Sequence, residues 1–124
     1  MWYDRQNGYV VVERTGLLSL QDARAFLDQS LQLVATMRRE RGYARVLVLN
    51  RDNVVQSREV TDLFANTPSQ IQGPDDRVAL VANTALTKLQ ADRLARGGPE
   101  RVFMSEEEAV AWLREPIVQH AAKS

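Results

Sequence analysis

The chain alternates along its length between short apolar runs and longer stretches whose apolar residues follow helical spacing. The clearest runs are Val46–Leu49, Val78–Val81 and Val102–Met104. Runs of consecutive apolar residues are typical of strands that are buried on both faces. Such strands, when helices join them, form a largely parallel sheet covered by helices. The pattern therefore limits the chain to the α/β class.

The first fifteen residues predict a β-hairpin. Tyr9–Val12 consists of residues with strong strand preference. Asn7 and Gly8 stand just before this run, and an Asn-Gly pair supplies the positive φ angles that a two-residue turn requires. We therefore expect two antiparallel strands joined by a tight turn at Asn7–Gly8.

A long helix is predicted from about Leu20 to Arg41. Ser19 is a natural N-cap and Gly42 a natural C-cap. Phe26 and Leu33 form a second apolar line beside the main stripe of this helix. That line either packs on the sheet or contacts a second subunit, so a homodimer is one of the two expectations.

Three strand–helix units are predicted after this helix. The strands are Arg45–Leu49, Arg77–Val81 and Arg101–Met104, and the helices begin at Ser57, at Asn83 or Thr84, and at Ser105. Ser105 and Glu108 form a capping box. The predicted order is ββαβαβαβα, with a mixed, mostly parallel five-stranded sheet and four helices. We expect one domain over residues 1–115 and a tail over 116–124.

Composition excludes several classes of function. Sixteen basic and sixteen acidic residues give a formal net charge of zero, so no overall field attracts nucleic acid. The chain has no Cys, and its single histidine, His120, lies in the predicted tail, so thiolate chemistry and a catalytic triad are excluded. Glycine-rich phosphate-binding motifs are absent. We expect no cofactor, no metal site and no enzymatic activity.

No apolar run is long enough to cross a bilayer. The opening residues Trp2, Tyr3 and Asp4 lack the basic start and apolar segment of a signal peptide. We therefore expect a cytoplasmic protein without membrane insertion. Trp2, Tyr3 and Trp112 either belong to an interface or cover the sheet edge and the last helix.

Polar residues follow the central strand. Asn50, Asp52 and Asn53 lie beyond its carboxyl end, where open α/β sheets usually bind ligands. Asx residues also form such turns by themselves. The nearby Ser57 can cap the next helix through its hydroxyl group.

At the other edge of the sheet, Asp75 and Asp76 precede a strand, and we expect them in a solvated loop. Arg38, Arg39 and Arg41 fall in the last turn of the long helix. Cations at this position stabilise the negative end of the helix dipole. The basic cluster is therefore interpreted as part of the helix end.

The chain resembles the STAS domains, which are named for sulphate transporters and anti-sigma factor antagonists, and in particular small stand-alone SpoIIAA-like proteins of bacteria. The resemblance covers about residues 2 to 115. It depends on the element order, the long first helix, the strand Leu47-Val48-Leu49-Asn50 with its short following helix, and the acidic, Trp-bearing ending Val102–Leu113.

The resemblance implies a non-enzymatic binding or regulatory module that recognises another protein. In STAS antagonists a partner kinase phosphorylates an Asp-Ser-containing segment; here Gln56 stands where the Asp is expected, and Ser57 is the serine nearest that position. The expected regulatory or partner-binding residues are Asn50, Asp52, Asn53, Gln56, Ser57, Arg58 and Glu59. The fold also resembles lipid-binding CRAL-TRIO domains, which implies a small apolar ligand or lipid as the alternative. An enzyme using Asp52 or Glu59 is the third alternative.

Overall fold

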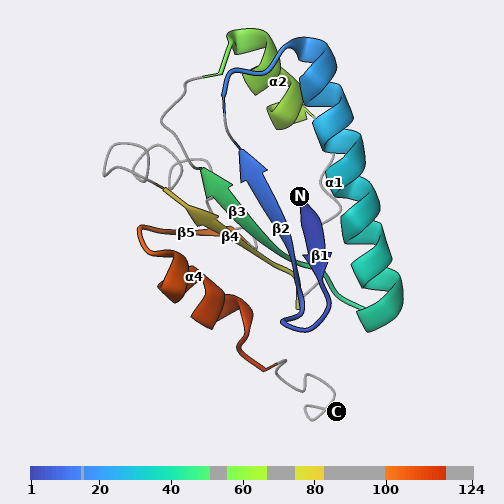
Figure 1. The fold of residues 1–124 in the computed structure, drawn as a ribbon, viewed down its shortest axis with the longest axis vertical. Coiled ribbons are helices and arrows are strands. Elements are labelled where there is room, and N and C mark those ends of the chain that lie inside the picture. Colours follow the sequence, from blue (N-terminus) through green and yellow to red (C-terminus); the bar gives the residue numbers. More distant parts are fainter. Residues whose placement is uncertain (15, 51–55, 67–74, 83–99, 117–124) are drawn as a thin grey trace.

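The computed structural model describes residues 1–14, 16–50, 56–66, 75–82 and 100–116. Within these residues it has three helices and one five-stranded mixed sheet (Figure 1). The strands are β1 (Trp2–Asp4), β2 (Tyr9–Arg14), β3 (Arg45–Asn50), β4 (Arg77–Val81) and β5 (Glu100–Phe103), and the helices are α1 (Leu20–Arg41), α2 (Arg58–Asn66) and α4 (Glu106–Leu113). The predicted α/β class and five-stranded mixed sheet are confirmed.

The strands lie in the sheet in their sequence order, from β1 to β5. β1 is antiparallel to β2, and each following pair is parallel. The helix predicted to begin at Asn83 or Thr84 falls outside the described residues, as does the tail from residue 117. The full order ββαβαβαβα with four helices therefore remains a prediction, as do the domain limits.

The central strands are buried on both faces, as their apolar runs predict. Alternate residues point to opposite sides of a strand; Val46 and Val48 of β3 pack with Val34 and Met37 of α1. The intervening Leu47 and Leu49 belong to the cluster that contains Ala109 and Leu113 of α4. The long helix α1 thus covers one face of the sheet, and α4 covers the other (Figure 1).

The ends of α1 are those that its sequence predicts. The Ser19 hydroxyl oxygen accepts a hydrogen bond from the Asp22 backbone N–H at 3.0 Å. Gly42 takes the left-handed conformation, with φ of 80°, and its N–H donates to the Arg38 carbonyl at 2.8 Å. Glycine adopts this conformation without the steric cost that a Cβ would impose.

The hairpin forms, but the predicted two-residue turn is wrong. The connection between β1 and β2 spans residues 5–8, and among the described non-glycine residues none has a positive φ. Asp4 explains the longer turn. Its carbonyl accepts the Gly8 N–H at 2.8 Å, and its carboxylate accepts the backbone and side-chain N–H groups of Asn7 at 3.0 and 2.8 Å. The three hydrogen bonds that Asp4 accepts stabilise this four-residue connection.

Candidate functional site

The carboxyl ends of the parallel strands form one edge of the sheet, at which α1 and α2 begin (Figure 1). We call residues 16–19 and 56–59, which precede and open these helices, the carboxyl edge. Asn50 is the last residue of β3, and its backbone pairs with that of Arg14 in β2. Asp52 and Asn53 fall outside the described residues. The structure therefore brings Gln56, Ser57, Arg58 and Glu59 of the predicted site to this edge.

Gln56 joins the two segments of the carboxyl edge. Its Nε2 group donates a hydrogen bond to the Gly16 carbonyl at 2.9 Å, and its Oε1 atom accepts one from the Leu18 backbone N–H at 2.9 Å. The amide thus holds the peptide groups on both sides of Leu17. The sequence places Gln56 in the site but gives no sign of this contact, because its partners lie 40 and 38 residues earlier.

Leu17 projects from this fixed backbone into solvent. The residue is 68% exposed, more than any other large apolar residue in the part of the chain that the structure describes. Gly16, which precedes it, has a φ of 75°. Sequence reasoning missed Leu17, since the pair Leu17–Leu18 between a strand and a helix has no spacing that distinguishes an exposed leucine from a buried one.

Ser57 acts as the N-cap of α2. Its Oγ atom accepts a hydrogen bond from the Val60 backbone N–H at 3.3 Å, and its carbonyl accepts one from the Thr61 N–H at 2.9 Å. Val60 is buried, whereas Ser57, Arg58 and Glu59 are exposed. The first turn of α2 is therefore anchored on its inner side and open to solvent on its outer side.

Asp76 at the opposite edge is not in a solvated loop, and that prediction is wrong. Its residue exposure is only 3%. One carboxylate oxygen accepts the Ala44 backbone N–H at 2.8 Å, and the other accepts Arg38 Nη2 at 2.6 Å. Buried carboxylates persist where they are paired and hydrogen-bonded. The neighbouring Asp75 is half-buried.

Two arginines hold the carboxyl end of α4. Arg45, which is 3% exposed, donates from Nη1 to the carbonyls of Leu113 and Glu115 at 2.5 and 2.7 Å. Arg77 donates to the Trp112 carbonyl at 2.7 Å and to the Glu115 carboxylate at 2.8 Å. Burial lowers the pKa of Arg45. The Leu113 carbonyl, at the end of α4, is one of those that a helix leaves without an intrahelical partner, and Arg45 supplies its donor.

The aromatic residues differ in their exposure. Trp112 is half-buried; the guanidinium groups of Arg77 and Arg101 lie 4.8 and 4.9 Å from the centre of its ring. Tyr3 packs against the α1-side cluster, as do Phe26 and Leu33. Trp2 is 46% exposed. The second apolar line of α1 thus has a partner within the chain, while the homodimer remains an untested prediction.

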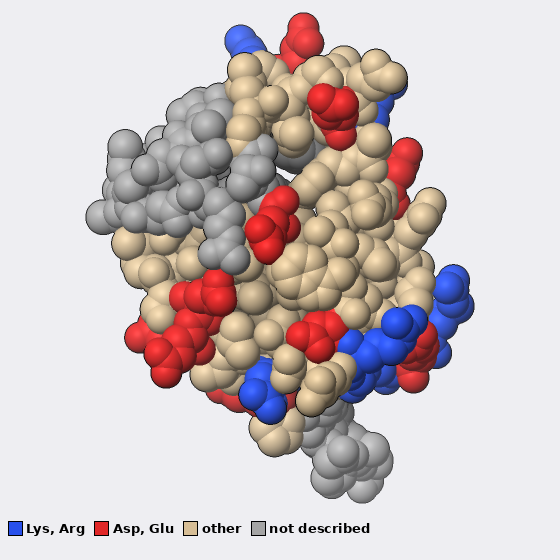
Figure 2. Space-filling model, in the orientation of Figure 1, with Lys and Arg blue, Asp and Glu red and all other residues tan. Residues whose placement is uncertain are grey.

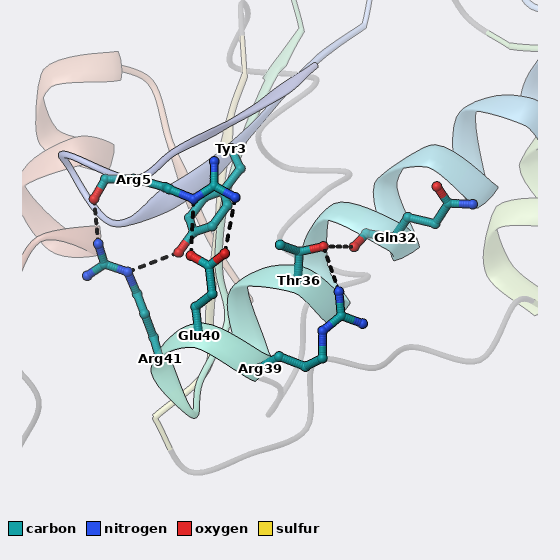
Figure 3. A network of polar contacts seen from close by, with 7 residues as sticks. All are labelled: Tyr3, Arg5, Gln32, Thr36, Arg39, Glu40 and Arg41. Carbon is teal, nitrogen blue, oxygen red and sulfur yellow. Dashed lines mark hydrogen bonds and ion pairs between the residues drawn. The ribbon is translucent and has the colours of Figure 1, made fainter.

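The basic cluster at the end of α1 is engaged with acceptors of this chain. Arg5 donates to both carboxylate oxygens of Glu40 at 3.1 Å, and this lowers the pKa of Glu40. Arg41 donates to the Tyr3 hydroxyl at 3.0 Å and to the Arg5 carbonyl (Figure 3). Figure 2 shows the basic side chains gathered here with acidic groups among them. The network links the β1–β2 turn to α1.

Within the described residues, no three acidic or histidine side chains are grouped so that they could hold a metal ion. Across the same parts of the chain, every helix is too short or too polar to span a bilayer. Comparison with protein-family models, with curated proteins and with solved structures yields no match to this chain. The resemblance to STAS domains therefore remains a prediction.

Proposed function

We propose that the chain is a non-enzymatic, STAS-like binding or regulatory module that recognises another protein at its carboxyl edge, without an intact Asp-Ser phosphoacceptor motif. The observation that supports the proposal is the fixed but exposed first turn of α2. Ser57 caps the helix, Gln56 ties its start to the loop before α1, and Arg58 and Glu59 remain exposed.

This arrangement suits recognition because hydrogen bonds within the chain already hold its backbone in place. Ordering a loop and its side chains on binding costs free energy, and a pre-organised surface avoids most of that cost. Arg58 and Glu59 carry opposite charges at adjacent exposed positions. Exposed charges at the rim of an interface control the association rate and the choice of partner.

A double charge reversal tests the proposal. We expect Arg58→Glu combined with Glu59→Arg to reduce the recovery of a partner protein from native lysate about fivefold or more, because rim charges set specificity. The matched control is Arg24→Glu combined with Asp28→Arg, an exposed pair on α1. Both variants keep the net charge of the wild type. Equal recovery with both variants would contradict recognition at the carboxyl edge.

The alternative, a carrier of a small apolar ligand or lipid, is tested on the same purified protein. Native mass spectrometry would then show a bound mass beyond the 14.0 kDa of the chain. Phosphorylation of Ser57 is a hypothesis that depends on its position alone, and the homodimer and the cytoplasmic location remain predictions. A mass gain at Ser57 after incubation with a kinase would support the first of these, and sedimentation tests the second.

A further inference from the structure

We infer that Leu17 is the apolar anchor of the proposed recognition site, that Gln56 positions it, and that the partner is a protein with an apolar pocket that accepts a leucine side chain. The inference rests on the proposed function and specifies how recognition occurs. Leu17 follows β2 in sequence, whereas Gln56 precedes α2, so only the folded chain brings them together.

The side-chain amide of Gln56 holds the backbone on both sides of Leu17, and we call this pair of hydrogen bonds the Gln56 clamp. The Gln56 amide donates to the carbonyl on one side of Leu17 and accepts from the N–H on the other, each at 2.9 Å. Two such bonds to the peptide groups that flank one residue fix the orientation of that residue. Gly16 supplies the left-handed backbone that leads into it, with φ of 75°. Its backbone is thus held on both sides, while Leu17 as a whole is left 68% exposed.

Leu17 is surrounded in the carboxyl edge mainly by polar positions. Of the other positions of the carboxyl edge, Ser19, Ser57, Arg58 and Glu59 are polar and exposed, and the apolar Leu18 is half-buried. An apolar centre with a polar rim is the usual composition of a protein interface. An anionic membrane surface would instead require an excess of basic residues. The mixed charges of Arg58 and Glu59 therefore favour a protein as the partner.

Amide hydrogen exchange measures the clamp independently of any partner. In Gln56→Ala the Leu18 amide loses its acceptor, so we expect it to exchange about fivefold faster, the factor for one net hydrogen bond. Gln56→Glu keeps an acceptor for Leu18 but cannot donate to Gly16, and we expect a smaller increase. Gln21→Ala, an exposed glutamine on α1, is the matched control. Unchanged exchange in Gln56→Ala would overturn the positioning role.

Photo-crosslinking tests whether binding of the partner depends on Leu17. Benzoylphenylalanine replaces the exposed Thr61 on α2, or Gln29 on α1 as the control position, and the full chain is irradiated in native lysate. We expect a covalent adduct with a different protein from position 61 only. Leu17→Ala and Gln56→Ala should each reduce that adduct roughly tenfold, as loss of a central contact does, while Gln21→Ala leaves it unchanged.

Each other outcome overturns the inference. If the adduct persists in Leu17→Ala, Leu17 is not the anchor. If it is lost in Leu17→Ala but persists in Gln56→Ala, Gln56 does not position Leu17. An adduct with twice the mass of the chain identifies a second copy instead. Leu17-dependent sedimentation with phosphatidylcholine–phosphatidylserine vesicles identifies a membrane. If the wild type gives no adduct at position 61, the proposed function fails as well, and the Leu18 exchange rate shows whether the clamp exists without it.

Discussion

The carboxylate of Asp76 accepts the backbone N–H of Ala44 at 2.8 Å, and thereby joins the residue before β4 to the residue before β3. The Arg77 N–H donates to the Ala44 carbonyl at 3.1 Å, so both peptide groups of Ala44 are paired. Arg38 at the end of α1 donates to the same carboxylate. One buried acidic group thus connects α1 with the first residues of two parallel strands.

Replacement of Asp76 should destabilise the fold. In Asp76→Ala the buried N–H of Ala44 and the guanidinium of Arg38 lose their acceptor, and we expect the free energy of unfolding to fall by about 2–4 kcal/mol. Asp76→Asn keeps an oxygen acceptor but loses the charge, so its effect should be smaller. Urea denaturation measures both. Asp62→Ala, at an exposed position, is the control and should remain within about 0.5 kcal/mol of wild type. A similar value for Asp76→Ala would contradict its role.

Replacement of Arg45 should loosen α4. In Arg45→Ala the carbonyls of Leu113 and Glu115 lose their donor, and we expect a loss of about 2–3 kcal/mol together with faster hydrogen exchange in α4. The Nε atom of Arg45 is buried and has no hydrogen-bond partner in the described residues, so removal of this cation offsets part of the loss. Arg114→Ala, at an exposed position next to α4, should change neither quantity. Equal rates of hydrogen exchange in α4 in the two variants would contradict the role of Arg45 in holding this helix.

Acid should weaken the link between the β1–β2 turn and α1. The hydrogen bonds from Arg5 lower the pKa of Glu40 below its ordinary value of 4.5. A carboxyl group with a lowered folded-state pKa stabilises the fold above its unfolded-state pKa, and that contribution is lost as the pH falls below it. The free energy of unfolding of the wild type should therefore fall more steeply than that of Glu40→Gln between about pH 5 and pH 3. If the free energy of unfolding of the wild type and of Glu40→Gln changed in parallel with pH, the stabilising role of the ion pair would be contradicted.

Base should weaken the packing around Tyr9. Burial raises the pKa of Tyr9 above its ordinary value of 10.0. The unfolded chain therefore releases this proton at a lower pH than the folded chain, and stability falls as the pH rises above 10.0. Tyr9→Phe has no proton to lose, so its urea midpoint should change less between about pH 9 and pH 11. The idea fails if the two midpoints decrease in parallel.

Local sequence could predict the features that depend on contacts between residues close together in the chain. Ser19, Gly42 and Ser105 cap helices because their partners lie three or four residues away. The apolar run at Val46–Leu49 predicts a strand buried on both faces, since alternate residues of any strand point to opposite sides. For these elements the spacing of the apolar residues and the capping residues are sufficient for a correct prediction.

The turn at residues 5–8 shows the limit of a local pattern. Asn7 and Gly8 suit a two-residue turn, but Asp4 accepts three hydrogen bonds from this segment and stabilises a longer connection. A motif of two residues does not account for an acceptor that stands three residues before it.

Spacing along the chain is sufficient to predict the class of the fold, the positions of the capped helices and the strands with two buried faces. It does not predict that Asp76 and Arg45 are buried connectors or that Gln56 holds Leu17 outward, because those features arise from packing. Each of these contacts joins residues more than thirty positions apart, and the same side chains are ordinary polar loop or strand residues until packing removes water from them. The candidate site is therefore a product of the fold rather than of a motif.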